Sequence, residues 1–264
     1  MLIDTDSQLY RIEVRIKGVY RSYKGIIFKV LEQSKLEKYI NSRVLLGATY
    51  KVLTDIIKTP KENDKIYLLE QDNILEICTH EPIEFQPDMT ELFSQCIFSI
   101  LDISQLDTSK VVSMQQCFFY SKIDKLIMTG LNLSNLTNLS KTFCGFKGNI
   151  YGLETITFKE DVVLTKCFES SRILNGIDLS NIPKERLTLG MFSRCTTPII
   201  KIKELNEARF NIFDNASVNE VHIDKLIAYN RKFDFEYWMC LAHINNNIDN
   251  ITINTVEIRG QTNE

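Results

Sequence analysis

The sequence lacks any long apolar run, and no stretch approaches the roughly 18 apolar residues that a membrane-spanning helix needs. It also lacks the basic start and apolar core of a signal peptide, because Asp4 and Asp6 stand where those features would be. We therefore expect a soluble, cytoplasmic protein that makes no contact with a membrane.

Histidine and glycine are scarce, with 3 and 10 of the 264 residues. The glycines form neither a phosphate-binding loop nor a dinucleotide fingerprint. His80, His222 and His243 are far apart, and none has a neighbour at the spacing of a metal site or a catalytic triad. These absences predict a protein that is not an enzyme and binds no cofactor and no metal.

Charge of one sign is not in excess. The chain has 31 basic and 34 acidic residues, a formal net charge of -3, and no run of Lys and Arg that would follow a phosphate backbone. Nucleic acid is therefore a poor candidate ligand, and we expect the partner to be a protein.

Seven cysteines are present, an odd number with no Cys-x-x-Cys pair, which fits neither a complete disulfide framework nor a zinc knuckle. We interpret them as small buried apolar residues. The competing interpretation is a thiol-dependent enzyme in which Cys195 is the nucleophile and His222 the base. We favour the structural interpretation, because Cys195 occupies a position of the repeat described next.

Six phenylalanines recur at spacings of 25, 25, 25, 24 and 21 residues. Each is followed three positions later by a residue that is small in five of the six cases. A fixed period of this length indicates a solenoid, in which each unit buries its apolar face against its neighbours. The phenylalanines, here called the phase phenylalanines, are Phe93, Phe118, Phe143, Phe168, Phe192 and Phe213.

Short apolar segments near each phase phenylalanine predict strands in which the flanking residues point inward and the central residue points outward. The third unit departs from the common offset, so we predict an insertion over residues 146–152. The outward residues form a predicted protein-binding surface, here called the ladder: Asp102, Ile127, Thr157, Asp178, Lys201 and His222.

The segments outside the repeat predict a β-rich N-terminal domain at 1–82, the solenoid at 83–225 and a C-terminal cap at 226–264. Within the first domain, Ser34 is the predicted N-cap of a short helix, with Glu37 completing a capping box. The cap is predicted to hold a helix or loop with an aromatic cluster (Phe233, Phe235, Tyr237, Trp238), followed by a strand over 250–258. Predicted strands cover 10–20, 26–31, 43–53 and 66–77, the last with a turn at 71–73.

The motif Leu101-Asp-Ile-Ser, then Leu106-Asp-Thr-Ser-Lys-Val and Met114-Gln-Gln-Cys-Phe118, closely resembles the BspA-type leucine-rich repeat. Met191-Phe-Ser-Arg-Cys195 resembles the end of the same repeat. The resemblance covers about half the chain and implies a leucine-rich-repeat fold, a β-rich solenoid of the α+β class with about six units of 21–25 residues. Members of the family are largely surface proteins of bacteria and protists that bind other proteins.

Together these features predict a non-enzymatic, intracellular protein-binding module that acts as an adaptor or as an inhibitor occluding its partner. A composition rich in Ile, Lys and Asn is typical of AT-rich bacterial and phage genomes, so a phage-encoded inhibitor of a host system is one form of this hypothesis. The alternative function is that of a bacterial surface adhesin. The aromatic cluster at 233–238 is a second candidate contact surface, although we favour a role in the core of the cap.

Overall fold

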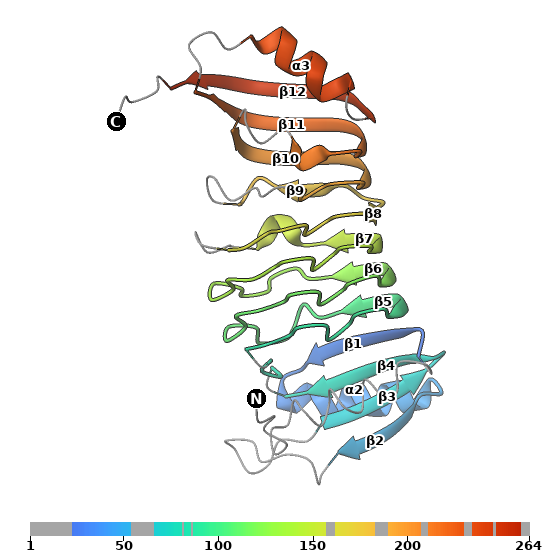
Figure 1. Ribbon diagram of the computed structural model, residues 1–264. Coiled ribbons are helices and arrows are strands. Elements are labelled where there is room, and N and C mark those ends of the chain that lie inside the picture. Colours follow the sequence, from blue (N-terminus) through green and yellow to red (C-terminus); the bar gives the residue numbers. More distant parts are fainter. Residues whose placement is uncertain are drawn as a thin grey trace.

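The computed structural model describes residues 23–53, 66–80, 82–85, 87–156, 162–182, 190–206, 211–229, 234–244 and 247–259. Within these ranges the chain forms one β-rich, mixed and mostly parallel sheet of 12 strands, with few helices. In Figure 1 the strands are stacked from β2 at one end of the molecule to β12 at the other. The predicted strand 10–20 lies outside the described residues.

The first elements are β1 (Gly25–Val30), α2 (Gln33–Leu45), β2 (Thr49–Leu53), β3 (Ile66–Gln71) and β4 (Ile74–Thr79). The central ones are β5 (Ile97–Asp102), β6 (Lys122–Ile127), β7 (Lys147–Tyr151), the 3-10 helix η1 (Leu153–Thr155), β8 (Arg172–Ile173) and β9 (Ile177–Leu179). The last ones are β10 (Thr196–Asn206), β11 (Ser217–Ala228), α3 (Phe235–Ile244) and β12 (Asn247–Ile258).

The N-terminal strands join the rest of the sheet through β1, which pairs in parallel with β4 on one side and β5 on the other. Strands β2, β3 and β4 are antiparallel, whereas β5 and all later strands pair in parallel. The predicted hairpin turn is confirmed, since Asp72 and Asn73 both have positive φ angles (53° and 62°) between β3 and β4. The sheet therefore passes from antiparallel to parallel pairing at β4.

Two local predictions for residues 33–53 are wrong. Residues 43–45 belong to α2 rather than to a strand, and only Thr49–Leu53 forms β2. The N-cap of α2 is Glu32, not Ser34, and no side chain caps it. Helix α2 is instead held by packing on the outer face of the sheet, where Leu36 and Ile40 are buried against β3 and β4 residues. Burial of this apolar face outweighs the missing cap.

The phase phenylalanines stack in single file, as predicted. Successive ring centroids lie 5.2–5.7 Å apart, and the ring planes differ by 4–16° from Phe93 to Phe213. All six side chains are at most 2 % exposed. Close, offset aromatic stacking adds to the burial of apolar area, so this column is the central feature of the core.

A repeated backbone turn holds each phenylalanine in place. Around the first five phenylalanines, the residues two before and two after adopt left-handed φ angles, for example Gln116 (54°) and Tyr120 (50°) around Phe118; at Phe213 only Asn215 does so (53°). In this conformation alternate N–H groups point along the stack. Phe118 N and Tyr120 N donate to the carbonyls of Thr142 and Cys144, 3.0 and 2.8 Å away. Backbone hydrogen bonds therefore also join neighbouring units in the turns that precede the strands.

The C-terminal end combines α3 with β12, in agreement with the predicted helix and strand. Trp238 of α3 and Ile248 of β12 are buried in the main core, 6 and 4 % exposed. Phe235 and Tyr237 are 39 and 63 % exposed, and Phe233 lies outside the described residues. Within the predicted aromatic cluster, Trp238 therefore packs in the core, whereas Phe235 and Tyr237 are exposed to solvent.

Candidate functional site

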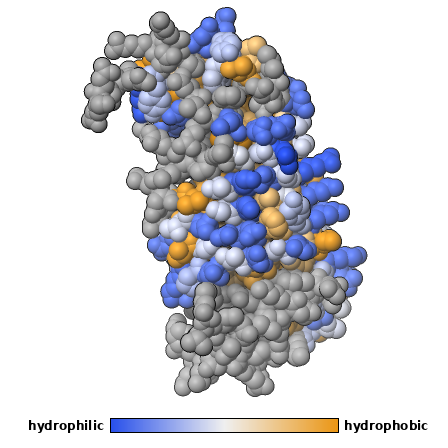
Figure 2. Space-filling model, in the orientation of Figure 1, coloured by the Kyte–Doolittle hydropathy of each residue, from blue (hydrophilic) through white to orange (hydrophobic). Residues whose placement is uncertain are grey.

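The candidate site is the outer face of the parallel strands. Residues on either side of each described ladder position are buried, such as Leu101 and Ile103 around Asp102, so the alternation predicted from sequence is confirmed at those five positions. The face is open from β5 to β12 among the described residues, whereas α2 covers it over β1, β3 and β4. In Figure 2, hydrophilic residues gather along the right-hand edge, where Figure 1 places β5 to β8.

The structure divides the ladder into two groups. Asp102 and Ile127 are register neighbours on β5 and β6, and Asp178, Lys201 and His222 are register neighbours on β9, β10 and β11. Thr157 lies outside the described residues. Its expected place beside Ile127 is occupied by Tyr151 of β7.

The insertion predicted at 146–152 is therefore wrong, because Lys147–Tyr151 is itself the strand and the additional residues begin at η1. Gly148 makes residues 147–151 look unlike a strand in the sequence, because glycine is depleted in strands. It aligns with Ile123 of β6, and a Cβ atom on it would lie 1.7 Å from the Ile123 carbonyl oxygen.

The Asp residues of the ladder have a structural role as well. The Asp102 carboxylate accepts hydrogen bonds from the Ser104 N–H (3.0 Å) and hydroxyl (2.7 Å), and Asp178 accepts the same pair from Ser180 (3.1 and 2.7 Å). Burial alone would raise the pKa of Asp178, but the bonds from Ser180 and Lys201 outweigh it and hold that pKa below its usual value. The Asp-x-Ser motif thus forms a turn at the end of the strand.

Lys201 is the central charge of the second group. Its ammonium lies 3.3 Å from the Asp178 carboxylate, and its side chain is 48 % exposed. His222 beside it is bonded to Glu220, with 3.0 Å between Nε2 and Oε2. Exposed pairs of this kind contribute little to stability, so the Lys201 ammonium and the His222 ring remain available for a partner.

A depression interrupts the face between the two groups. Strand β8 is only two residues long, and the Asn175 side chain replaces the missing strand by bonding both the N–H (3.0 Å) and the carbonyl (2.7 Å) of Ile150. The depression is about 180 Å³, and Glu154, Asp178 and Lys201 contribute its charged walls. It is smaller than the roughly 300–1,000 Å³ of a typical small-molecule pocket, so it suits a single protruding side chain.

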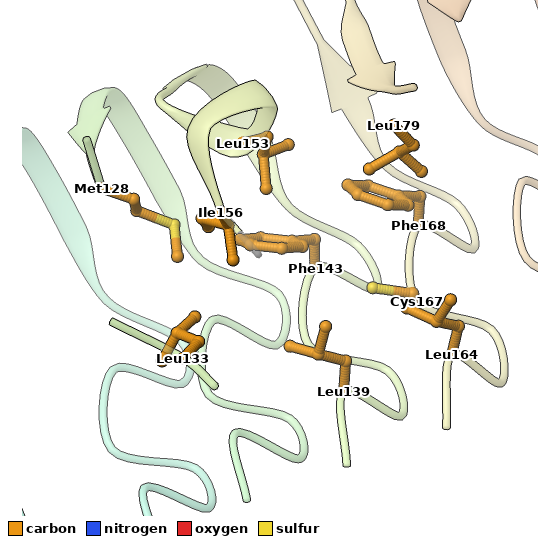
Figure 3. A pocket seen from close by; sticks show the side chains of 10 residues that line it. All are labelled: Met128, Leu133, Leu139, Phe143, Leu153, Ile156, Leu164, Cys167, Phe168 and Leu179. Carbon is orange, nitrogen blue, oxygen red and sulfur yellow. The ribbon is translucent and has the colours of Figure 1, made fainter. Parts of the chain in front are cut away.

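A second cavity lies inside the core beside the stacked rings of Phe143 and Phe168, and Figure 3 shows the ten apolar residues that line it. Its volume is about 10 Å³, which is at the lower limit for one water molecule. Its lining offers no polar group. Such a space is a packing defect rather than a binding site.

Cys195 and His222 do not meet. The Cys195 thiol is fully buried, 3.3 Å from the Ser171 hydroxyl, and burial raises its pKa to about 12. His222 lies on the outer face beside Lys201. Among the described residues, no group of three or more His, Cys, Asp or Glu side chains could hold a metal ion, and no helix could cross a membrane.

Thiol labelling of the native protein should be confined to Cys240. All seven cysteines lie in the described ranges, and six are buried while Cys240 is exposed. Burial raises the pKa of both Cys96 and Cys195 to about 12, so little thiolate is present at neutral pH. We expect iodoacetamide to modify Cys240 at least about tenfold faster than the others, as followed by peptide mass spectrometry. Equal rates at Cys195 and Cys240 would favour the enzyme hypothesis.

Comparisons with protein-family models, curated proteins and solved structures find no match.

One feature of the face was missed from the sequence. Lys122, Lys147 and Arg172 are the first residues of β6, β7 and β8, and they are register neighbours. Each follows a phase phenylalanine by four positions, so the repeat itself contains the signal. A search for contiguous basic residues does not detect charges that are 25 positions apart.

Proposed function

We propose that the chain is a non-enzymatic protein-binding module that acts as an adaptor or as an inhibitor occluding a surface of its partner. The observation that carries this proposal is the open outer face, on which exposed charged and apolar side chains stand in register over successive strands. The cavity found in the core between the stacked units is small and apolar, with a volume of about 10 Å³. A protein that is built to present a surface acts by binding.

The finer architecture that we propose is a leucine-rich-repeat-like solenoid of about six units of 21–25 residues. The stacked phenylalanines and the parallel register at intervals of 25 residues, as between Lys122 and Lys147, support it. The likeness of the Leu-Asp-x-Ser and Met-x-x-Cys-Phe motifs to the BspA-type repeat also supports it. Repeat proteins use the extended face of their stacked strands to bind partners.

Affinity capture from a lysate of the source organism, or of its host, tests the proposal. The partner is identified by mass spectrometry, and its affinity is then measured for the wild type and for ladder variants. We expect Lys201→Glu to weaken binding about tenfold, because it places a repulsive charge at the centre of the face. Asp178→Asn separates the roles of Asp178, since it removes the charge and keeps the oxygen that accepts the Ser180 bonds.

The matched control is Lys141→Glu, which makes the same change of charge at an exposed position in a turn outside the strands. We expect this variant to bind like the wild type. Equal affinity of the wild type and both ladder variants would move the contact away from the ladder. Failure to capture any protein from either lysate would count against the proposed function as a whole.

A further inference from the structure

A row of three cations follows the start of the parallel strands. Lys122, Lys147 and Arg172, here called the cation row, are exposed and are paired residue by residue across β6, β7 and β8. Neighbouring strands lie about 4.8 Å apart, so the three side chains leave the sheet side by side. The row continues into Thr196, Ser217 and Asn247, all of which can donate hydrogen bonds.

The cation row has no ion-pair partner among the described residues. The ion pairs found there involve other lysines and arginines, such as Lys110 with Glu84 and Lys166 with Glu169. Within two positions of the three cations along the chain, the only carboxylate is Asp124. Like charges directly opposite each other on neighbouring strands are destabilising, so an anionic partner would relieve this repulsion.

Apolar side chains border the row. Ile97 is the register neighbour of Lys122 on β5 and is 71 % exposed. Tyr120 precedes Lys122 by two residues and is 59 % exposed, and Leu174 follows Arg172 by two and is 50 % exposed. A nucleic acid or another polyanion would gain little from Ile97 and Leu174. A protein segment that carries both carboxylates and apolar side chains would use both kinds of residue.

We infer that the cation row binds an acidic, amphipathic helix of a partner protein, lying along the stack and across β6, β7 and β8. Carboxylates three or four positions apart on a helix are separated by about 5 Å along its axis, close to the strand spacing of about 4.8 Å. One carboxylate can therefore face each cation, while apolar residues of the helix contact Ile97 and Leu174. This inference rests on the proposed function and names the chemistry of the partner.

The test uses a synthetic, fluorescein-labelled 18-residue helical peptide with Glu at every third or fourth position and Leu beside each Glu. Its binding to the full chain is followed by fluorescence anisotropy. Changing Lys122, Lys147 and Arg172 together to Gln is expected to weaken binding about tenfold to a hundredfold, because three exposed ion pairs are lost. Raising the salt concentration should weaken wild-type binding and have little effect on the variant.

The matched control changes Lys35, Lys38 and Lys110 to Gln, three exposed lysines outside the row, and removes the same total charge. It should bind the peptide as the wild type does, and thermal melts should show that both triple variants are folded. A peptide with every Glu changed to Gln should bind at least about tenfold more weakly than the Glu peptide.

Three results would overturn the inference: no binding of the Glu peptide by the wild type, equal losses in both triple variants, or tighter binding of a 20-base-pair DNA duplex than of the peptide. The proposed function is judged separately. If the captured partner binds the cation-row variant as tightly as the wild type, the inference fails and the protein-binding function stands. If the ladder variants and the cation-row variant all leave capture unchanged, the inference fails and the contact lies elsewhere on the protein; if neither lysate yields a captured protein, the proposed function fails.

Discussion

Replacing Phe143 with alanine is expected to lower the free energy of unfolding by about 3–5 kcal/mol. Phe143 is 1 % exposed and stacks on Phe118 and Phe168 at centroid distances of 5.4 and 5.2 Å. It also contacts the edge of Phe146, with the two rings at 86°. Truncation would remove these contacts and enlarge the small cavity that Phe143 already lines, as Figure 3 shows. Urea unfolding followed by circular dichroism measures the loss.

Two further variants test whether the loss of stability is specific to the stacked phenylalanines. Phe143→Leu retains most of the buried volume, so we expect a smaller loss of about 1–2 kcal/mol. Phe119→Ala is the matched control, because Phe119 is next to the column in sequence but is only half-buried and is not part of the stack. A cost for Phe119→Ala as large as that for Phe143→Ala would contradict the central role of the column.

Replacing Gly148 with alanine is expected to destabilise the protein by at least about 3 kcal/mol. The φ angle of Gly148 is +146°, a conformation that residues with a Cβ atom rarely adopt. The added Cβ would also lie 1.7 Å from the carbonyl oxygen of Ile123, which is backbone and cannot rotate away. Strand β7 would have to move from β6, and the register of Lys122 with Lys147 would be lost with it.

Gly130→Ala is the control that separates backbone strain from steric overlap. Gly130 has a φ angle of +78°, but nothing lies within 4 Å of the position of its Cβ. We expect a cost of about 1–2 kcal/mol, which is the price of the left-handed conformation alone. If the Gly130 and Gly148 variants melt at the same temperature, the close approach of β7 to β6 is not what requires glycine at position 148.

The column and the ladder illustrate what the sequence can predict. Phe93 to Phe213 stand out because a large, fully buried side chain recurs at one position of every unit, and such a residue has few substitutes. The outward direction of Asp102, Lys201 and His222 follows from the buried residues on both sides of each. Both predictions depend only on the spacing of residue types along the chain, which can be read directly from the sequence.

The predictions that the structure corrects concern residues whose role depends on a neighbouring strand. In the sequence, 156–158 resembles a strand more than Lys147-Gly-Asn-Ile-Tyr151 does, and only the approach of Ile123 explains the glycine of the observed strand. Ser34 has the residue type of an N-cap, yet α2 begins at Gln33 because its buried face sets its position. The cation row was missed because Lys122, Lys147 and Arg172 become neighbours only when units are superposed.

The interval of 25 residues that relates the starts of β6 and β7 has a consequence for how such a chain can change in length. Lys122 pairs with Lys147, and Phe118 stacks on Phe143, at the same interval of 25 residues. A tandem duplication of 118–142 would therefore insert one more strand and one more ring without disturbing those on either side. Each duplication would lengthen the stack by one strand spacing, about 4.8 Å. The length of the binding face can therefore evolve in equal steps.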